Sequence, residues 1–178
     1  MTSSPFTGIN HLCVVTSDME RSVRAWSDRY GVGPWEIWTK DASNMSAFVE
    51  GNPAQYVMRA AMCPVSASFR LELIQPLDGH GPYARSLAQH HGRDHVHHIR
   101  FDVADYDAAR QGLERVGAHV LADEEFSGAP GVPERFRATY FATEEDLGFV
   151  LQIGQAPTDF QMPPPDERYP AAESEALR

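Results

Sequence analysis

Four polar residues recur at matching points in the two halves of the chain and together could bind a metal ion. They are His11, Glu72, His98 and Gln152. Each half contributes one imidazole and one side-chain oxygen from the middle of a predicted strand. Two nitrogen and two oxygen ligands suit a divalent first-row metal, so we expect one ion of Zn, Ni, Co, Mn or Fe. The alternative is a pair of core histidines with satisfied hydrogen bonds and two polar residues at strand ends.

Two arginines are expected to share the faces of these ligands. Residues two positions apart on a strand point the same way, which places Arg70 beside Glu72 and Arg100 beside His98. Either guanidinium could bind a carboxylate or phosphate of a substrate. An ordinary ion pair with one of the many acidic residues is an equally good interpretation.

Aromatic residues provide further candidates for a substrate contact. Trp35 and Trp38 could line a pocket suited to a ring-bearing substrate, and Tyr140 is another candidate for the cleft. Such residues also form ordinary core or dimer contacts. His97 is expected to point away from His98, because side chains alternate along a strand, and to support the site or pack in the core.

The elements that must position these residues follow a duplicated pattern. A predicted strand at 9–16 leads to a helix capped by Asp18, and a predicted strand at 97–103 leads to a helix capped by Asp105. In each half the histidine precedes the capping aspartate by seven residues. Further strands are expected at 35–39, 47–50, 55–62, 68–75, 118–124, 135–142 and 148–154. This self-similarity indicates two copies of a βαβββ unit.

The predicted organisation is one domain over residues 6–155. It divides into module one (6–76), a linker helix (77–94) and module two (95–155). We expect an α+β fold in which the duplicated βαβββ modules pair into a curved mixed sheet around a metal-centred cleft. A proline-rich tail follows at 156–178, and its prolines are expected to keep it out of the sheet.

Composition excludes several classes of protein. The chain has 178 residues, of which 42% are hydrophobic, enough for the core of one domain. A net charge of −10 argues against a nucleic-acid partner. There is no apolar run long enough for a membrane span and no signal-peptide pattern at the N-terminus. The chain has only two cysteines, so a disulfide scaffold is not expected. We therefore expect a cytoplasmic location.

Several segments resemble the vicinal oxygen chelate superfamily, which includes glyoxalase I, methylmalonyl-CoA epimerase, extradiol dioxygenases and antibiotic-resistance proteins. They are INHLCVVTSDMERSVRAW, LELIQP, HHIRFDVADYDAA and GFVLQIGQ. The epimerase and glyoxalase-like branch is the most similar. The resemblance implies that His11, Glu72, His98 and Gln152 are the metal ligands. It also implies a homodimer, because relatives commonly dimerise.

The ligand set departs from that of the epimerases in one respect. They usually carry Glu on the last strand and Gln at the earlier oxygen position, whereas here these positions hold Gln152 and Glu72. Arg59 also falls near the position of a second acidic base. A neutral amide cannot act as a general base, so Glu72 becomes the best base candidate. Methylmalonyl-CoA is therefore not the expected substrate.

Three functions remain open. The first is a metal-dependent isomerase, epimerase or lyase that acts on a small carbonyl compound, ring-bearing or anionic, through a metal-stabilised enolate with Glu72 as proton carrier. The second is a mononuclear iron dioxygenase using His11, His98 and Glu72, although extradiol relatives place the carboxylate where this chain has Gln152. The third is a non-enzymatic small-molecule binding or resistance protein, which typically lacks the metal ligands.

Overall fold

The structure is a computed structural model that describes residues 4–132 and 135–170. Its strands are β1 (Phe6–Val15), β2 (Trp35–Lys40), β3 (Met45–Val49), β4 (Asn52–Ala54), β5 (Met58–Pro64), β6 (Arg70–Pro76), β7 (His95–Val103), β8 (His119–Ser127), β9 (Arg135–Ala142), β10 (Val150–Gln155) and β11 (Glu167–Tyr169). Its helices are α1 (Met19–Arg24) with a π-helical continuation η1 (Ala25–Arg29), α2 (Gly81–Gln89), α3 (Tyr106–Arg115) and α4 (Glu144–Leu147).

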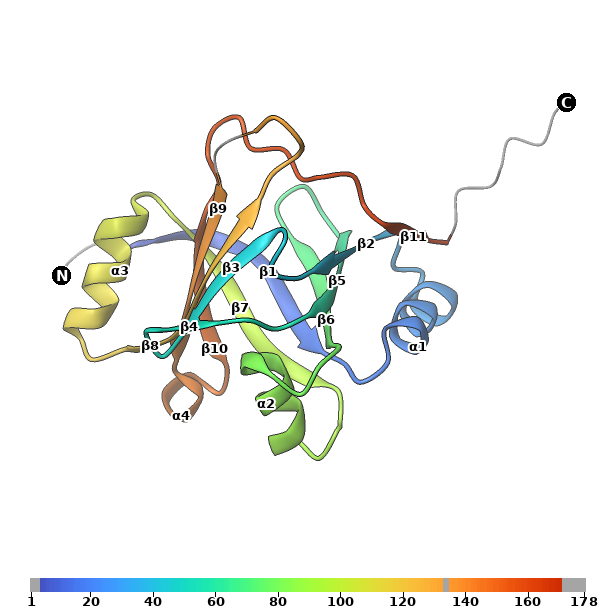
Figure 1. Cartoon of the computed structure of the whole chain (residues 1–178), viewed down its shortest axis with the longest axis horizontal. Helices are drawn as coiled ribbons and strands as arrows, with labels where there is room; N and C mark the ends of the chain where they lie inside the picture. Colours follow the sequence, from blue (N-terminus) through green and yellow to red (C-terminus); the bar gives the residue numbers. More distant parts are fainter. Residues whose placement is uncertain (1–3, 133–134, 171–178) are drawn as a thin grey trace, which may run out of the picture.

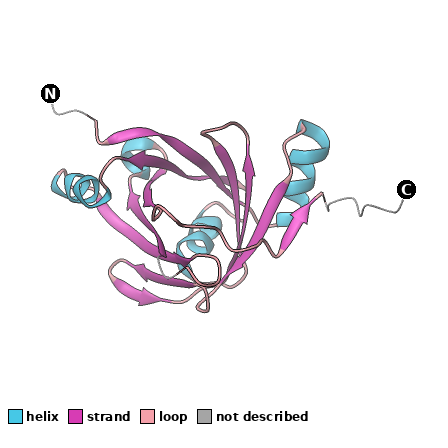
Figure 2. Cartoon of the chain, turned by 90° about the horizontal axis from the view of Figure 1, so that it is seen from above, coloured by secondary structure: helices cyan, strands magenta, loops and turns pink. Residues whose placement is uncertain are grey.

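The described strands form one mixed sheet in the order β11-β2-β5-β6-β1-β7-β10-β9-β8-β3-β4. The sheet curls strongly, with α1 and α3 at opposite ends of the molecule and α2 below the junction of β1, β6 and β7 (Figure 1; Figure 2). This arrangement confirms the predicted α+β class and the curved mixed sheet. No helix in the described part of the chain has the length and apolar character needed to cross a bilayer.

The two halves repeat one strand order. Reading outward from the centre, the first half runs β1, β6, β5, β2 and the second runs β7, β10, β9, β8. The halves join where β1 and β7 pair antiparallel, while β6 and β10 each lie parallel to the first strand of their own half. The β3–β4 hairpin departs from the repeat and pairs through β3 with β8 of the other half. The four candidate ligands therefore lie on the four central strands.

The same capping interaction begins the first helix of each half. Asp18 accepts a hydrogen bond from the Arg21 backbone N–H at 3.0 Å, and Asp105 accepts one from that of Ala108 at 2.9 Å. Each carboxylate satisfies a backbone donor in the first turn of its helix, as predicted for both caps. The first helix is less regular than its sequence pattern suggested, because the α-helix ends at Arg24 and continues as a π-helical turn.

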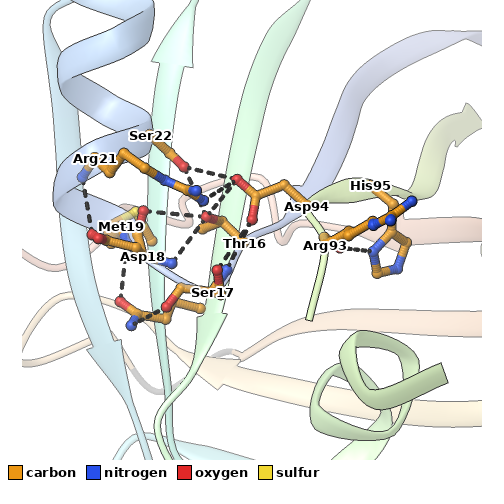
Figure 3. A network of polar contacts seen from close by, with 10 residues as sticks. Thr16, Ser17, Asp18, Met19, Arg21, Ser22, Arg93, Asp94 and His95 are labelled. Atoms are coloured by element: carbon orange, nitrogen blue, oxygen red, sulfur yellow. Dashed lines mark hydrogen bonds and ion pairs between the residues drawn. The ribbon is translucent and has the colours of Figure 1, made fainter. Parts of the chain in front are cut away.

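A network of polar contacts near the surface holds the two central strands together at one end (Figure 3). The Asp94 carboxylate, just before β7, accepts hydrogen bonds from the Thr16 hydroxyl at 3.0 Å and the Ser17 backbone N–H at 3.1 Å. It also pairs with Arg21 of α1 at 2.6 Å. One residue thus links the start of β7, which carries His98, to the end of β1, which carries His11, and to the start of α1.

The expectation that prolines exclude the tail from the sheet is wrong. Residues 167–169 pair antiparallel with β2, with Arg168 opposite Glu36. Prolines 163–165 and 170 bracket this segment but do not interrupt it. A short edge strand needs hydrogen-bonding groups on one side only, so flanking prolines are compatible with it.

Candidate metal centre

Three of the predicted ligands converge in the interior of the curled sheet. His11 Nε2 lies 3.1 Å from His98 Nε2 and 3.5 Å from Glu72 Oε2, and His98 Nε2 lies 3.2 Å from the same oxygen. Both histidines are buried. These side chains come from β1, β6 and β7, so the sheet order brings together residues 87 positions apart in the sequence.

The fourth predicted ligand, Gln152 on β10, also lies in the interior. It is 2% exposed, and its Oε1 has no hydrogen-bond partner among the described residues. A buried amide oxygen without a donor is unfavourable and calls for a positively polarised partner. A cation would satisfy that oxygen. The other polar group close to Gln152 is the His11 ring, whose Nδ1 also lacks a hydrogen-bond partner among the described residues.

Electrostatics place the histidine and the carboxylate in the protonation states that metal ligands require. Burial lowers the pKa of His11 to about 3, against the opposing attraction of Glu72. Burial alone would raise the pKa of Glu72, but neighbouring His11 and His98 outweigh it and lower the pKa to about 2. At neutral pH the site therefore presents a neutral imidazole and an ionised carboxylate.

The spacing of the donor atoms fits a metal ion. Ligand bonds of about 2.0–2.2 Å at tetrahedral or octahedral angles separate neighbouring donors by roughly 2.8–3.6 Å. The three observed separations of 3.1–3.5 Å fall within that range. The two imidazoles and the carboxylate thus fit a divalent first-row cation, and the unpartnered amide oxygen of Gln152 is a candidate fourth donor.

β-Bulges aim both histidines. Between β1 and β7 the register shifts at three points. Two of them fall at Asn10, just before His11, and at His97, just before His98. A bulge adds an unpaired residue and reorients the strand that carries it. The prediction that His97 points away from His98 is therefore wrong in detail: both are buried, and their Nδ1 atoms lie 3.0 Å apart. His97 does support the site, since this contact fixes the ring of His98.

The site opens into a cavity of about 290 Å³ with largely apolar walls. Arg70, Arg100 and Tyr140 line it together with His11, Glu72 and Gln152. Arg100 stacks over the Phe136 ring at 4.6 Å, and its buried Nε has no hydrogen-bond partner among the described residues.

The predicted substrate contact of Trp35 is not supported. Trp35 is buried beneath α1 in a cluster with Met19 and Val23, and its indole N–H donates to the Val32 carbonyl oxygen at 2.8 Å. Trp38, three positions later and on the other face of β2, lines the cavity instead. The alternation of strand side chains separates the two tryptophans, a signal that the sequence already contained.

A buried carboxyl cluster beside the cavity was missed from the sequence. Glu124 of β8 accepts hydrogen bonds from the hydroxyls of Tyr56, Tyr83 and Tyr140. Burial raises the pKa of Glu124 to about 7, although the three tyrosines oppose the shift. Tyr83 and Tyr140 line the cavity, so this cluster fixes two of its aromatic walls. The four residues come from separate elements, and their polar and aromatic types follow no recognisable spacing.

A second missed residue is Lys40, the only lysine in the chain. It lies at the end of β2, faces the cavity and is 4% exposed. A single lysine among many arginines gave no indication of its place, because composition does not report position.

A curled duplicated sheet with candidate metal ligands on its four central strands is the feature to compare with known protein families. The chain matches the Glyoxalase/Bleomycin resistance protein/Dioxygenase superfamily over residues 10–136, and it belongs to that family. The family is the vicinal oxygen chelate superfamily that the sequence segments resemble.

Solved structures with the same fold include methylmalonyl-CoA epimerases. The enzyme from Mycobacterium tuberculosis is 18% identical with a TM-score of 0.61, and the match covers 88% of this chain and 93% of that one. A Streptomyces coelicolor epimerase variant in complex with 2-nitronate-propionyl-CoA is 19% identical with a TM-score of 0.62, covering 89% and 99%. A Bacillus halodurans protein described as hypothetical is 12% identical with a TM-score of 0.59, covering 84% and 94%. The search of curated proteins gave no significant match.

Proposed function

We propose that this protein is a metal-dependent isomerase or epimerase that acts on a small carbonyl compound by enolate chemistry. The observation that carries the proposal is the convergence of His11, His98 and Glu72, whose donor atoms lie 3.1–3.5 Å apart in the interior. The unpartnered oxygen of Gln152 belongs to the same cavity and comes from β10, the strand next to β7. The epimerase activity named for similar structures is consistent with it.

His11, His98, Glu72 and Gln152 would hold the cation. When bound, a divalent cation supplies a Lewis acid that polarises a carbonyl and stabilises the charge that develops as an α-proton leaves. The largely apolar walls of the cavity lower the local dielectric, which strengthens electrostatic interactions within it.

Glu72 is the proposed proton carrier. It is the one carboxylate that lines the cavity among the described residues, and it is ionised at neutral pH. An ionised carboxylate can accept the α-proton and return it to the same or the opposite face, or to a neighbouring carbon. Gln152 lacks a basic group, so the proton carrier of this protein lies on β6 rather than on β10.

Metal analysis and α-proton exchange test the proposal together. Plasma mass spectrometry of the purified protein should find about one first-row metal per chain, lost from the His11→Ala, His98→Ala double variant. NMR in D₂O should then detect metal-dependent exchange of α-protons in a panel of small 2-oxo acids and hydroxyketones. Absence of metal after reconstitution would refute the proposal and leave a binding protein as the better interpretation.

An iron dioxygenase is the second candidate, because two histidines and one carboxylate form the donor set of many non-haem iron oxygenases. The same metal analysis separates the two. Iron as the bound metal, with oxygen uptake on catechols, would favour the dioxygenase over enolate chemistry.

A further inference from the structure

Lys40 places an isolated positive charge in the wall of the cavity. Its residue is 4% exposed, and its ammonium nitrogen lies 5.6 Å from the centre of the Phe126 ring. Its strand, β2, lies two strands from β6, which carries Glu72. Lys40 follows Trp38 by two residues, so the two side chains lie on the same face of β2. It therefore faces the same space as the candidate metal centre from a separate position.

The ammonium of Lys40 has no carboxylate partner among the described residues. No carboxylate oxygen there lies within the 4.0 Å that defines an ion pair. Asp166 and Glu72 attract it only from farther away, and burial lowers its pKa. The arginine Arg59 shows the contrast, since its guanidinium pairs with both Glu20 and Glu167. The Lys40 side chain is almost fully covered, but its ammonium is not one of the fully enclosed unpartnered atoms, so it reaches the cavity, where an anion of a ligand can pair with it.

The other charged groups around the cavity favour an anion as well. Three cations line it, Lys40, Arg70 and Arg100, against the single carboxylate of Glu72. Arg100 pairs with Asp102 at 3.6 Å, so Lys40 and Arg70 are the cavity cations without an ion pair among the described residues. The aromatic walls, which include Trp38, Phe126 and Phe136, suit an apolar or ring-bearing body.

The proline-rich tail forms part of the cavity wall. Phe160 and Met162 line it from residues that follow the last core strand. The segment is fixed by the Ala129 backbone N–H, which donates to the Gln161 carbonyl at 2.8 Å, and by the Trp38 indole, which donates to the Pro163 carbonyl at 2.9 Å. With a volume of about 290 Å³, the cavity is at the small end of the range for ligand sites.

We propose that Lys40 binds a carboxylate of the ligand, so that the natural substrate is a small free acid with an apolar or aromatic body. The inference rests on the proposed function for the position of the reacting carbonyl, near His11 and His98. The carboxylate would lie at the Lys40 end of the cavity, where the ammonium donates a charge-assisted hydrogen bond to it.

The test compares phenylacetate with phenylacetamide, which has the same shape but no charge. Calorimetry should show that the wild type prefers the acid and that Lys40→Met weakens phenylacetate binding at least tenfold, the scale of a charge-assisted hydrogen bond. Binding of phenylacetamide should stay within about twofold, which also reports that the variant folds. The matched control is Arg85→Met, which removes one exposed positive charge outside the cavity and should leave both affinities unchanged.

A second measurement needs no variant. Because Lys40 is the only lysine, lysine labelled with ¹³C at Cε gives one side-chain NMR signal, which phenylacetate should shift and phenylacetamide should not. Equal binding of acid and amide, or an unmoved lysine signal at saturation, would overturn the inference. Metal content and α-proton exchange, measured on the same samples, separate this failure from that of the proposed function: a metal-loaded, exchanging protein without acid preference refutes only the role of Lys40.

Discussion

At the scale of single residues, the central question is how Glu72 can serve both as ligand and as proton carrier. Its carboxylate lies 3.2–3.5 Å from two imidazole nitrogens, and its low pKa makes it a strong ligand but a weak base. A carboxyl of such low pKa accepts a proton readily only when the substrate is itself made more acidic. The proposed chemistry therefore depends on the site as a unit rather than on an unusually basic residue.

Glu72→Gln tests this dependence. With saturating metal, we expect α-proton exchange to fall at least 100-fold, because general acid–base catalysis typically contributes 10²–10⁴-fold. Deuterium incorporation followed by NMR measures the rate. The matched control is the double variant Glu72→Gln, Gln152→Glu, which keeps one carboxylate and one amide and should bind metal like the wild type. A fully metal-loaded Glu72→Gln protein that exchanges at the wild-type rate would contradict the assignment.

Glu124 is the other residue whose charge state matters. Burial raises its pKa to about 7 in the folded protein, against 4.5 for an unperturbed Glu. Between these values the folded protein binds more protons than the unfolded chain, so stability is full below pH 4.5 and falls as pH rises through 7. At roughly 1.4 kcal/mol per pKa unit, the complete loss is about 3.5 kcal/mol.

Glu124→Gln should remove this pH dependence, since its side chain does not ionise. We expect urea unfolding to show that the variant gains up to about 3 kcal/mol relative to wild type between pH 5 and pH 8. The neighbouring exposed residue provides the control: Glu125→Gln should follow the wild type at both pH values. A difference between Glu124→Gln and wild type that is the same at pH 5 and pH 8 would show that the carboxyl does not hold its proton.

At the scale of elements, the two helix caps make equivalent contributions in the two halves. Replacing Asp105 by Ala should lower the free energy of unfolding by about 1 kcal/mol, because the Ala108 backbone N–H loses its acceptor. Asp107→Ala is the control: that exposed side chain lies in the same helical turn but is not the cap, and its surface ion pair with Arg137 contributes little. Chemical denaturation of both variants measures the difference. Equal losses would contradict the capping role.

The elements themselves were largely predictable, but the details that aim the ligands were not. Alternating strands and capping aspartates are local signals, and they placed every candidate ligand on a strand. The bulges at Asn10 and His97 depend on pairing between β1 and β7, which sequence spacing alone does not contain. The same limit applies to Glu124, whose three tyrosine partners are distant in sequence.

At the scale of the whole molecule, the tail changes what the fold can do. Composition alone suggested that a proline-rich segment would stay outside the sheet, yet backbone pairing to β2 and contacts of Phe160 make it part of the cavity wall. Prolines limit a strand's hydrogen bonds but also restrict the unfolded chain, which lowers the entropy lost when a segment is fixed. The tail is thus suited to hold a fixed position over the cavity.

Truncation after Gln155 tests this role, since it removes the cavity residues Phe160 and Met162 and the strand β11. We expect the central strands to keep the proposed metal site, because all four candidate ligands precede the cut. Trp38 loses its indole partner Pro163 and becomes accessible to water. Acrylamide quenching of tryptophan fluorescence should therefore increase, and phenylacetate should bind at least tenfold more weakly. Truncation after Pro170, which keeps the whole of the described tail, is the matched control for the loss of residues 156–170. If the shorter chain retained metal, quenching and acid affinity like the wild type, the tail would be a passive extension, and the small size of the ligand would have to be set by the sheet alone.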